Sequence, residues 1–274
     1  MQASVDLPAG LAGEASETYQ PRVWNPLNNV VVFRFMHVLS RKLKALHSLP
    51  EEEEIALISA ISETLEVERG DEIAADGSHP NHSTVIIKGI ACRCKLFEDG
   101  RRQILSLQYP GDITDLYSYV MKRLDHGVAT LTPATIGKIP HETIAALCVQ
   151  YPNLAYALWR DSLVDMSKLH ATLMSLGTRS SKERLAHFLA EQYVRMLAVG
   201  LIHEGQPMDF GITQQDLADA IGLSLVHVNK TLAKLKDEGL MSWNRNQLKI
   251  LNWEALKKAG LFDQSYLHFR NVNV

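Results

Sequence analysis

The segment Ile212–Leu251, ITQQDLADAIGLSLVHVNKTLAKLKDEGLMSWNRNQLKIL, constrains the fold of this chain more than any other stretch. Its first part carries the local signals of a short helix. Thr213 and Asp216 have the spacing of a capping box, in which each side chain accepts a hydrogen bond from the other residue's backbone N–H. Gly222 can adopt the left-handed conformation that ends a helix. We therefore expect a helix that begins after Thr213 and ends at Gly222.

The rest of the segment predicts a second helix and a hairpin. Ser224 can cap a helix over Leu225–Glu238, which Gly239 would end. Two β-like runs follow, Met241–Trp243 and Gln247–Leu251. Two helices, a tight turn and a wing are the layout of a winged helix-turn-helix, which places its second helix in the major groove of DNA. The alternative is a helical hairpin that only packs.

The charge of this region agrees with contact to phosphates. Between Leu223 and Lys258 there are seven basic and three acidic residues, a local charge of +4. The whole chain, in contrast, has a net charge of −3. A basic surface on an acidic protein is typical of nucleic-acid binding, where neutralised phosphates set the affinity.

The composition indicates a globular protein of one or two domains. The chain has 274 residues, of which 46% are hydrophobic and 22% charged. We expect no membrane segment, because no run of about 18 apolar residues occurs, and no secretory signal, because the N-terminus lacks a basic region before an apolar one. Three cysteines fit a reducing compartment. The prediction is a cytoplasmic location.

The middle of the chain, Leu65–Pro140, predicts a β-domain. Asp99-Gly100 is a strong hairpin signal. Short strands at this spacing are typical of a sandwich or barrel. The β-like runs are Ser83–Ile87, Ile90–Phe97, Gln103–Gln108, Gly127–Leu131 and Thr135–Ile139.

A long helix is predicted over Pro152–Leu176, where no internal Gly or Pro occurs. Apolar residues and one histidine follow a 3-4-3-4-3 spacing along it, which is the seam of a coiled-coil dimer. The alternative is a helix that packs on its own β-domain. The seam consists of Tyr156, Trp159, Leu163, Met166, His170 and Leu173.

These segments together predict an α+β fold with four parts. We expect a flexible arm at 1–27, a β-roll or jelly-roll sensory domain at 28–150, a dimerisation helix with its hinge at 151–177, and a winged helix-turn-helix domain at 178–274. Helices are expected at Val31–His47 and from Glu51 toward Ser62 within the second part.

This order of parts resembles the Crp/Fnr family of bacterial transcription regulators. The resemblance covers roughly Arg41–Leu251, and its most specific parts are the helix-turn-helix and Val85–Ile113, VIIKGIACRCKLFEDGRRQILSLQYPGDI. It implies a homodimer that binds a palindromic site in double-stranded DNA, acts with RNA polymerase and senses a small signal through the N-terminal domain. The signal, the operator, the regulated genes and the choice between activation and repression stay open.

The resemblance also implies DNA-contacting residues. Leu225 and Val226 stand where better-known members have Arg and Glu, so their half-site is not expected here: Glu accepts from cytosine, whereas Val can only contact a thymine methyl. Lys230 replaces a second Arg and lacks its forked geometry. Phosphates are expected at Thr213, Gln214, Ser224 and His227, base edges at Leu225, Val226 and Lys230, and Asn229 and Arg245 complete the predicted surface.

The predicted ligand pocket departs from cyclic-nucleotide members. Their Gly-Glu pair for the ribose becomes Gly111-Asp112, and their phosphate-binding Arg with its neighbour becomes Leu124 and Asp125. A missing charged partner costs roughly 3–5 kcal/mol, so we expect cAMP not to be the ligand. Arg123 could restore the pocket after a loop shift, which keeps a cAMP-responsive regulator as an alternative.

Other residue patterns carry less information. Cys92 and Cys94 should face one side of a strand, as packed thiols or as a redox or metal pair. The chain lacks the four-cysteine set of an iron–sulfur regulator, whereas haem stays open. We predict no metal site, because the loop of His79 and His82 lacks a fourth ligand. No catalytic motif occurs, so we expect no enzyme. The rival is a cyclic-nucleotide-gated protein-interaction module.

Overall fold

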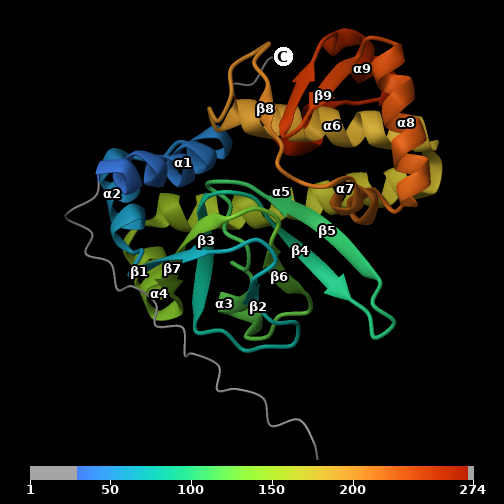
Figure 1. Ribbon diagram of the computed structural model, residues 1–274. Helices are drawn as coiled ribbons and strands as arrows, with labels where there is room; N and C mark the ends of the chain where they lie inside the picture. The colour runs from blue at the N-terminus through green and yellow to red at the C-terminus, as the bar shows by residue number, and fades with distance from the viewer. Residues whose placement is uncertain (1–29, 271–274) are drawn as a thin grey trace, which may run out of the picture.

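The computed structural model describes residues 30–270, with side chains from residue 38 onward. The arm predicted at 1–27 lies outside the described residues. Two helices open the described chain, α1 (Val30–Leu46) and α2 (Glu51–Ser59). Both agree with the predicted helices, and Figure 1 shows them at one end of the molecule beside the β-domain.

The β-domain consists of two antiparallel sheets, with strand orders β1-β7-β3 and β2-β6-β4-β5. The two sheets confirm the expected β-rich domain, and all five predicted runs are strands. The strands are β1 (Glu63–Val67), β2 (Glu72–Ala74), β3 (His82–Lys88), β4 (Ala91–Leu96), β5 (Arg102–Gln108), β6 (Gly127–Thr130) and β7 (Ala134–Pro140), with the helices α3 (Ser118–Met121) and α4 (His141–Gln150).

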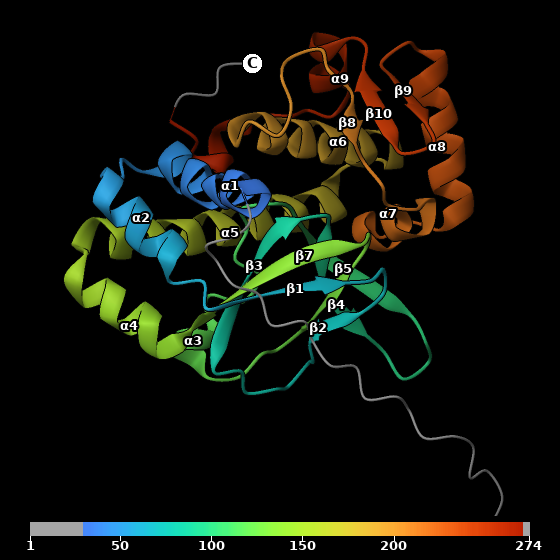
Figure 2. The same cartoon turned by 60° about the vertical axis from the view of Figure 1, so that its left-hand side comes forward.

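The predicted long helix is α5 (Pro152–Thr178), and Pro152 stands in its first turn, where a missing N–H costs nothing. Figure 2 shows α5 running from the β-domain to the C-terminal domain, beneath α1 and the helix α6 (Ser181–Ala198). Its buried face contains apolar residues such as Leu154 and Val164, but also Asp161 and Lys168. A long helix with charges on its buried face needs ionic partners there.

The C-terminal domain begins with α6, which Arg179 and Ser180 separate from α5. Ser180 and Glu183 form a capping box, which starts α6 at Ser181. The domain consists of α6 (Ser181–Ala198), β8 (Met208–Asp209), α7 (Gln214–Ile221), α8 (Leu225–Asp237), β9 (Met241–Asn244), β10 (Gln247–Ile250), α9 (Trp253–Ala259) and the 3-10 helix η2 (Gln264–Leu267).

The predicted helix-turn-helix and wing are confirmed in detail. Thr213 caps α7 through a capping box with Asp216, Gly222 ends this helix at φ 64°, and Ser224 caps α8. β9 pairs with β10 as the hairpin of the wing. Buried side chains of α6, α7 and α8 form one core, which continues into the sheet of β4 and β5. The two domains are therefore packed against each other.

In residues 30–270, the longest helices carry too many polar residues to cross a lipid bilayer.

Candidate DNA-binding surface and ligand cavity

One face of α8 is open to solvent and the other forms the core. Val228, Leu232 and Leu235 are buried at helical spacing, whereas the side chain of Val226 is 62% exposed. The exposed face of α8 contains six of the predicted contact residues. They are Ser224, Leu225, Val226, His227, Asn229 and Lys230.

The capped N-terminal ends of α7 and α8 are both open to solvent. Thr213 accepts a hydrogen bond from the N–H of Asp216 at 3.1 Å and donates its own N–H to that carboxylate at 2.8 Å. Ser224 accepts from the N–H of His227 at 3.3 Å. Thr213 and Gln214 are exposed. Helix N-termini present free N–H groups and a positive dipole end, which favours phosphate.

Arg245 lies in the turn of the wing, between β9 and β10. Arg245 is exposed and has a φ of 52°. Its carbonyl accepts a hydrogen bond from the indole Nε1 of Trp243 at 2.9 Å. This bond helps to hold a backbone conformation that is unfavourable for a residue with a side chain. Lys236 donates to the carbonyl of Trp243 at 3.4 Å, which ties α8 to the wing.

Helix α7 is held to the β-domain by its own capping residue. The carboxylate of Asp216 accepts a hydrogen bond from Nη2 of Arg69 at 2.7 Å and another from Arg102. Arg102 also reaches Asp219 through Nε at 2.8 Å. Figures 1 and 2 both place α7 beside β5. The position of the helix-turn-helix therefore depends on two arginines of the sensory domain.

A buried ionic cluster joins the helices α1, α5 and α6 to Asp112 in the loop after β5. Nζ of Lys42 on α1 lies 2.8 Å from Asp112 and 2.8 Å from Asp161 of α5. Nη2 of Arg195 on α6 lies 2.9 Å from Asp112. Burial would raise the pKa of Asp112, but Lys42 and Arg195 lower it to about 2. Asp112 is therefore an ionised link between the β-domain and the helices α1 and α6.

A cavity of about 320 Å³ lies between the β-domain and α5. This volume is within the usual range of small-molecule pockets. Of the predicted pocket residues, only Asp125 lines it. Its carboxylate accepts from the hydroxyl of Tyr117 at 2.9 Å and lies 2.8 Å from Nδ1 of His126. Burial would raise the pKa of Asp125, but Tyr117 and His126 lower it.

The other predicted pocket residues do not line this cavity. Asp112 belongs to the ionic cluster, and Leu124 is fully buried. Arg123 packs over the turn at Gly77. Gly111 has a φ of 94°, and a Cβ there would lie 2.7 Å from the carbonyl oxygen of Val38. Gly111 thus lets α1 approach the β-domain closely.

Two cavity residues, Arg93 and Asp165, were missed by the sequence analysis. Nη1 of Arg93 on β4 lies 2.8 Å from Asp165 on α5. Both line the cavity. The charged positions Asp161, Asp165 and Lys168 recur every three or four residues on the face of α5 that also carries buried Val164. Charges on an apolar helix face are a sequence signal for this cluster.

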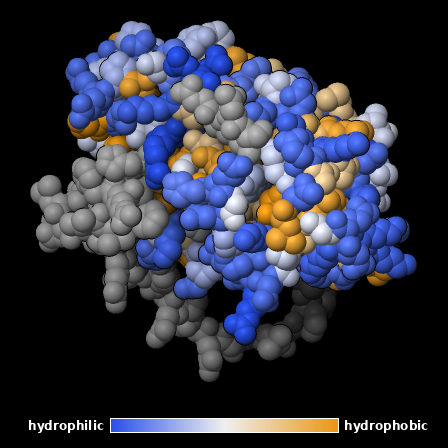
Figure 3. Space-filling view, turned by 90° about the horizontal axis from the view of Figure 1, so that it is seen from above, coloured by the Kyte–Doolittle hydropathy of each residue, from blue (hydrophilic) through white to orange (hydrophobic). Residues whose placement is uncertain are grey.

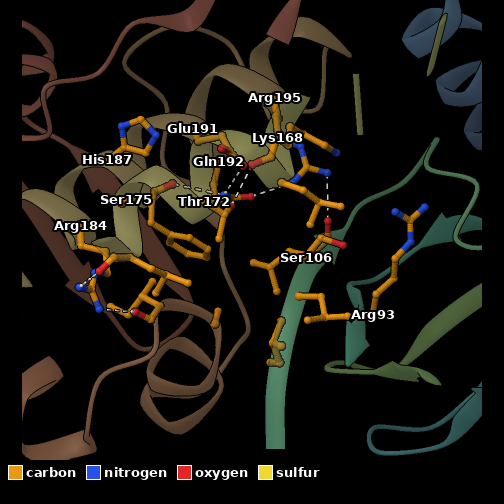
Figure 4. Close-up of a pocket in the computed structure, with 18 of the residues that line it drawn as sticks. Arg93, Ser106, Lys168, Thr172, Ser175, Arg184, His187, Glu191, Gln192 and Arg195 are labelled. Atoms are coloured by element: carbon orange, nitrogen blue, oxygen red, sulfur yellow. Dashed lines mark hydrogen bonds between the residues drawn. The ribbon is translucent and has the colours of Figure 1, made fainter. Parts of the chain in front are cut away.

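A second, smaller cavity of about 50 Å³ lies between β5, α5, α6 and α7. Figure 4 shows Lys168 of α5 gathered with Glu191, Gln192 and Arg195 of α6 at one side of it, and Arg184 at another. Both cavities are lined by the same segment of β5 and by the same turn of α5. The shared residues are Arg93, Leu105, Ser106, Asp165 and Leu169.

The predicted dimer seam lies on the exposed side of α5. Trp159 is 64% exposed and Leu173 69%. The remaining seam residues, Tyr156, Leu163, Met166 and His170, are exposed as well. In contrast, the face of the molecule in Figure 3 is mostly hydrophilic, with small separate apolar patches.

Cys92 and Cys94 both lie in the core between the β-domain and α7. They share one side, as expected, despite a bulge between Arg93 and Cys94. A hydrogen bond to Cys94 and burial raise the pKa of the Cys92 thiol. In the described part of the chain, no group of three or more His, Cys, Asp or Glu side chains is arranged to hold a metal ion.

Known proteins share both parts of this architecture. Residues 64–151 match the cyclic nucleotide-binding domain, and residues 183–259 match the Crp-like helix-turn-helix domain. The chain is 26% identical to the nitrogen fixation regulation protein FixK of Azorhizobium caulinodans over 68% of this chain and 74% of that protein. It is 23% identical to the transcriptional activator protein FnrL of Cereibacter sphaeroides over 70% of this chain and 77% of that protein.

Solved structures support the same fold. The structure of FixK2 from Bradyrhizobium japonicum superposes with a TM-score of 0.64 at 20% identity, covering 72% of this chain and 96% of that one. A putative cAMP-binding regulatory protein from Silicibacter pomeroyi superposes with a TM-score of 0.57 at 16% identity, covering 83% of this chain and 99% of that one. With both domain matches in this order, and with regulators as its relatives, the chain is a transcription regulator of the Crp/Fnr family.

Proposed function

We propose that this regulator binds palindromic double-stranded DNA as a homodimer in the cytoplasm, with α8 of each subunit in a major groove, and acts with RNA polymerase. The exposed face of α8, with Val226 62% exposed, is the observation that carries the proposal. The same domain carries two capped helix N-termini and a wing, which are the parts that contact the DNA backbone in this motif.

The contacts divide into positioning and reading. Thr213, Gln214, Ser224 and His227 bind phosphates, because they stand at the N-terminal ends of α7 and α8. Base edges meet Leu225, Val226 and Lys230, with Asn229 beside them and Arg245 reaching from the wing. An apolar pair at the start of α8 selects thymine methyl groups, whereas Lys230 can donate to guanine.

The exposed stripe on α5 supports dimerisation. Its large apolar side chains would cost free energy in water, and a second copy of α5 would bury them. Leu163→Glu places a charge in this seam, and we expect it to produce monomers in analytical ultracentrifugation. Val149→Glu is the control, because Val149 is 86% exposed at the end of α4, outside the stripe. A wild-type monomer at all concentrations would refute the dimer.

The cavity of the β-domain is the proposed signal site, or a vestige of one. The predicted departure from cAMP recognition is supported by the position of Leu124, which is buried away from the cavity. A cAMP-responsive regulator with a rearranged pocket remains the second candidate, because residues 64–151 match a cyclic nucleotide-binding domain.

Selection of bound duplexes from a randomised pool, with and without cAMP, tests the function. We expect palindromic enrichment that does not depend on cAMP. Lys230→Glu should lose the enrichment, whereas Lys88→Glu, an exposed lysine of the β-domain, should keep it. Enrichment only with cAMP would establish the cAMP-responsive candidate. No enrichment, together with tight cAMP binding, would favour a protein-interaction module.

A further inference from the structure

The cavity between the β-domain and α5 has an unusual balance of charge for a site related to nucleotide binding. Three carboxylates line it, those of Asp125, Asp161 and Asp165. Arg93 is the single Lys or Arg side chain among its described lining residues. An anionic ligand in this cavity would therefore depend on Arg93 for its charge partner.

The guanidinium of Arg93 is already held by the protein. Nη1 lies 2.8 Å from the carboxylate of Asp165. Nε donates to the carbonyl of Thr114 at 2.5 Å, and Nη2 donates to the carbonyl of Ile113 at 3.2 Å. The side chain is 12% exposed. Arg93 thus spans the space between its own sheet and α5, where it meets a fixed anion.

Asp165 is neutralised on both of its oxygens. Oδ2 faces Arg93 at 2.8 Å, and Oδ1 lies 2.6 Å from Nζ of Lys168, one turn further along α5. Burial would raise the pKa of Asp165, but Arg93 and Lys168 hold it well below its usual range. In the folded protein, the carboxylate of Asp165 is therefore ionised at neutral pH.

We propose that Asp165 is an internal anion that sets the ligand specificity of this cavity. It fills the anion-binding position of Arg93, so the cavity accepts uncharged or cationic small molecules and excludes phosphates and carboxylates. A role of this specificity in signalling rests on the proposed sensory function of the cavity. The exclusion of anions, in contrast, is a property of the protein without DNA.

Two physical costs oppose an incoming anion. If it displaced Asp165 from Arg93, a buried carboxylate would lose a charged partner, which is strongly unfavourable. If it settled beside the existing pair, it would give up hydration without gaining a charge partner, because Arg93 and Lys168 are already paired with Asp165. An uncharged ligand pays neither cost, and it can contact the apolar side chains of Ile113 and Met166.

The Arg93–Asp165 pair also stands where the two cavities meet, since both residues line both of them. The pair joins β4 to α5. In the smaller cavity, Arg195 and Glu191 of α6 line the wall together with this pair. An internal anion at this point fixes the β-domain against α5 without any ligand.

Asp165→Asn tests the proposal, because it removes the charge and keeps the shape. The probes are inorganic phosphate and cAMP, measured by isothermal titration calorimetry on full-length protein without DNA. We expect Asp165→Asn to bind both roughly 100-fold more tightly than wild type, because Arg93 then offers an incoming anion one unpaired unit charge in a partly buried site. Equal binding by wild type and variant would overturn the proposal.

Two further variants locate the effect. Asp161→Asn removes a carboxylate of the same cavity that pairs with Lys42 instead of Arg93, and it should bring no comparable gain. Adding Arg93→Gln to Asp165→Asn should abolish the gain. If Asp161→Asn gained as much, general charge would be the cause and Asp165 would have no special role.

A folding readout covers the case in which Asp165→Asn does not fold in ordinary buffer. Phosphate or acetate in the refolding buffer should then restore native near-ultraviolet circular dichroism, because either anion replaces the missing charge. Failure of both anions would overturn the proposal. None of these measurements involves DNA, so the result is independent of whether α8 reads a palindrome.

Discussion

The exposed face of α8 and the buried charges around α5 use the same residue types for opposite purposes. Lys230 on α8 is exposed, and its charge is available to a partner outside the chain. Lys168 on α5 is buried and lies 2.6 Å from Asp165. A solvated charge has little desolvation cost and can pair with DNA phosphates, whereas a buried charge needs an ionic or hydrogen-bonding partner within the protein.

Because of this difference, the exposed charges of α8 are available to bind a partner, whereas the buried charges around α5 hold the helices and the β-domain together. Asp112 resembles a ligand-binding residue in sequence, yet it joins Lys42 to Arg195 between domains. Substitutions in the buried cluster should therefore change stability, and substitutions on α8 should change DNA binding with little effect on stability.

The largest effect is expected for Asp112→Asn, which breaks the buried cluster. Arg195 would lose its carboxylate partner and Lys42 would keep only Asp161, and leaving a buried charge without its partner costs roughly 3–5 kcal/mol. Urea unfolding of the free protein measures this loss. Asp99→Asn is the control, because Asp99 pairs with Arg101 on the surface and should change stability by less than about 0.5 kcal/mol. Similar losses of unfolding free energy in both variants would show that the buried carboxylate contributes no more than the exposed one.

The acid limb of stability should depend on the same carboxyl. Because Asp112 has a pKa of about 2 in the folded state and near 3.8 when unfolded, its ionisation stabilises the fold above pH 4. This contribution, roughly 2–3 kcal/mol, is lost as pH falls through about 2. Acid titration of wild type against Asp112→Asn measures it. A wild-type curve with the same acid slope as the variant would contradict this assignment.

On α8, Val226→Glu should change which base is read. Glu accepts a hydrogen bond from the amino group of cytosine, whereas Val contacts only a methyl group, and a good contact discriminates by roughly 1–3 kcal/mol. Selection from a randomised duplex pool should show new preference for cytosine at one position of each half-site. An unaltered selected sequence would mean that Val226 lies away from the bases.

The smallest effect is expected for Lys230→Ala. Its loss should leave urea stability within about 0.5 kcal/mol of wild type, because the residue is exposed. If Lys230 contacts a phosphate, the slope of log affinity against log salt should fall by about 1; if it contacts guanine, one position should relax instead. Fluorescence anisotropy over a range of salt distinguishes these outcomes. Unchanged affinity and specificity would exclude Lys230 from the interface.

The helix-turn-helix was predictable because its signals are local. The capping box of Thr213 and Asp216 lies within one turn, Gly222 supplies the positive φ, and the apolar period of α8 is visible in the sequence. The edge strands β1 and β2 were missed. Both contain glutamates, which edge positions tolerate because one side of the strand faces solvent.

The cavity was not predictable in the same way, because its contacts join distant parts of the chain. Arg93 meets Asp165 across 72 positions, and Asp112 meets Arg195 across 83. No local pattern specifies which arginine reaches which carboxylate. The position of Leu124 could not be inferred either, since the direction of its side chain depends on how the loop before β6 packs.

Asp216 has a further consequence for how the two domains can part. Its carboxylate is shared between the cap of α7 and the arginines of the β-domain, Arg69 and Arg102. The bonds of Asp216 to Thr213 do not involve either arginine, so α7 can keep its cap when the two domains separate. The barrier to separation is then set by ion pairs and the apolar contact beneath them, and salt should speed the motion while leaving the helix intact.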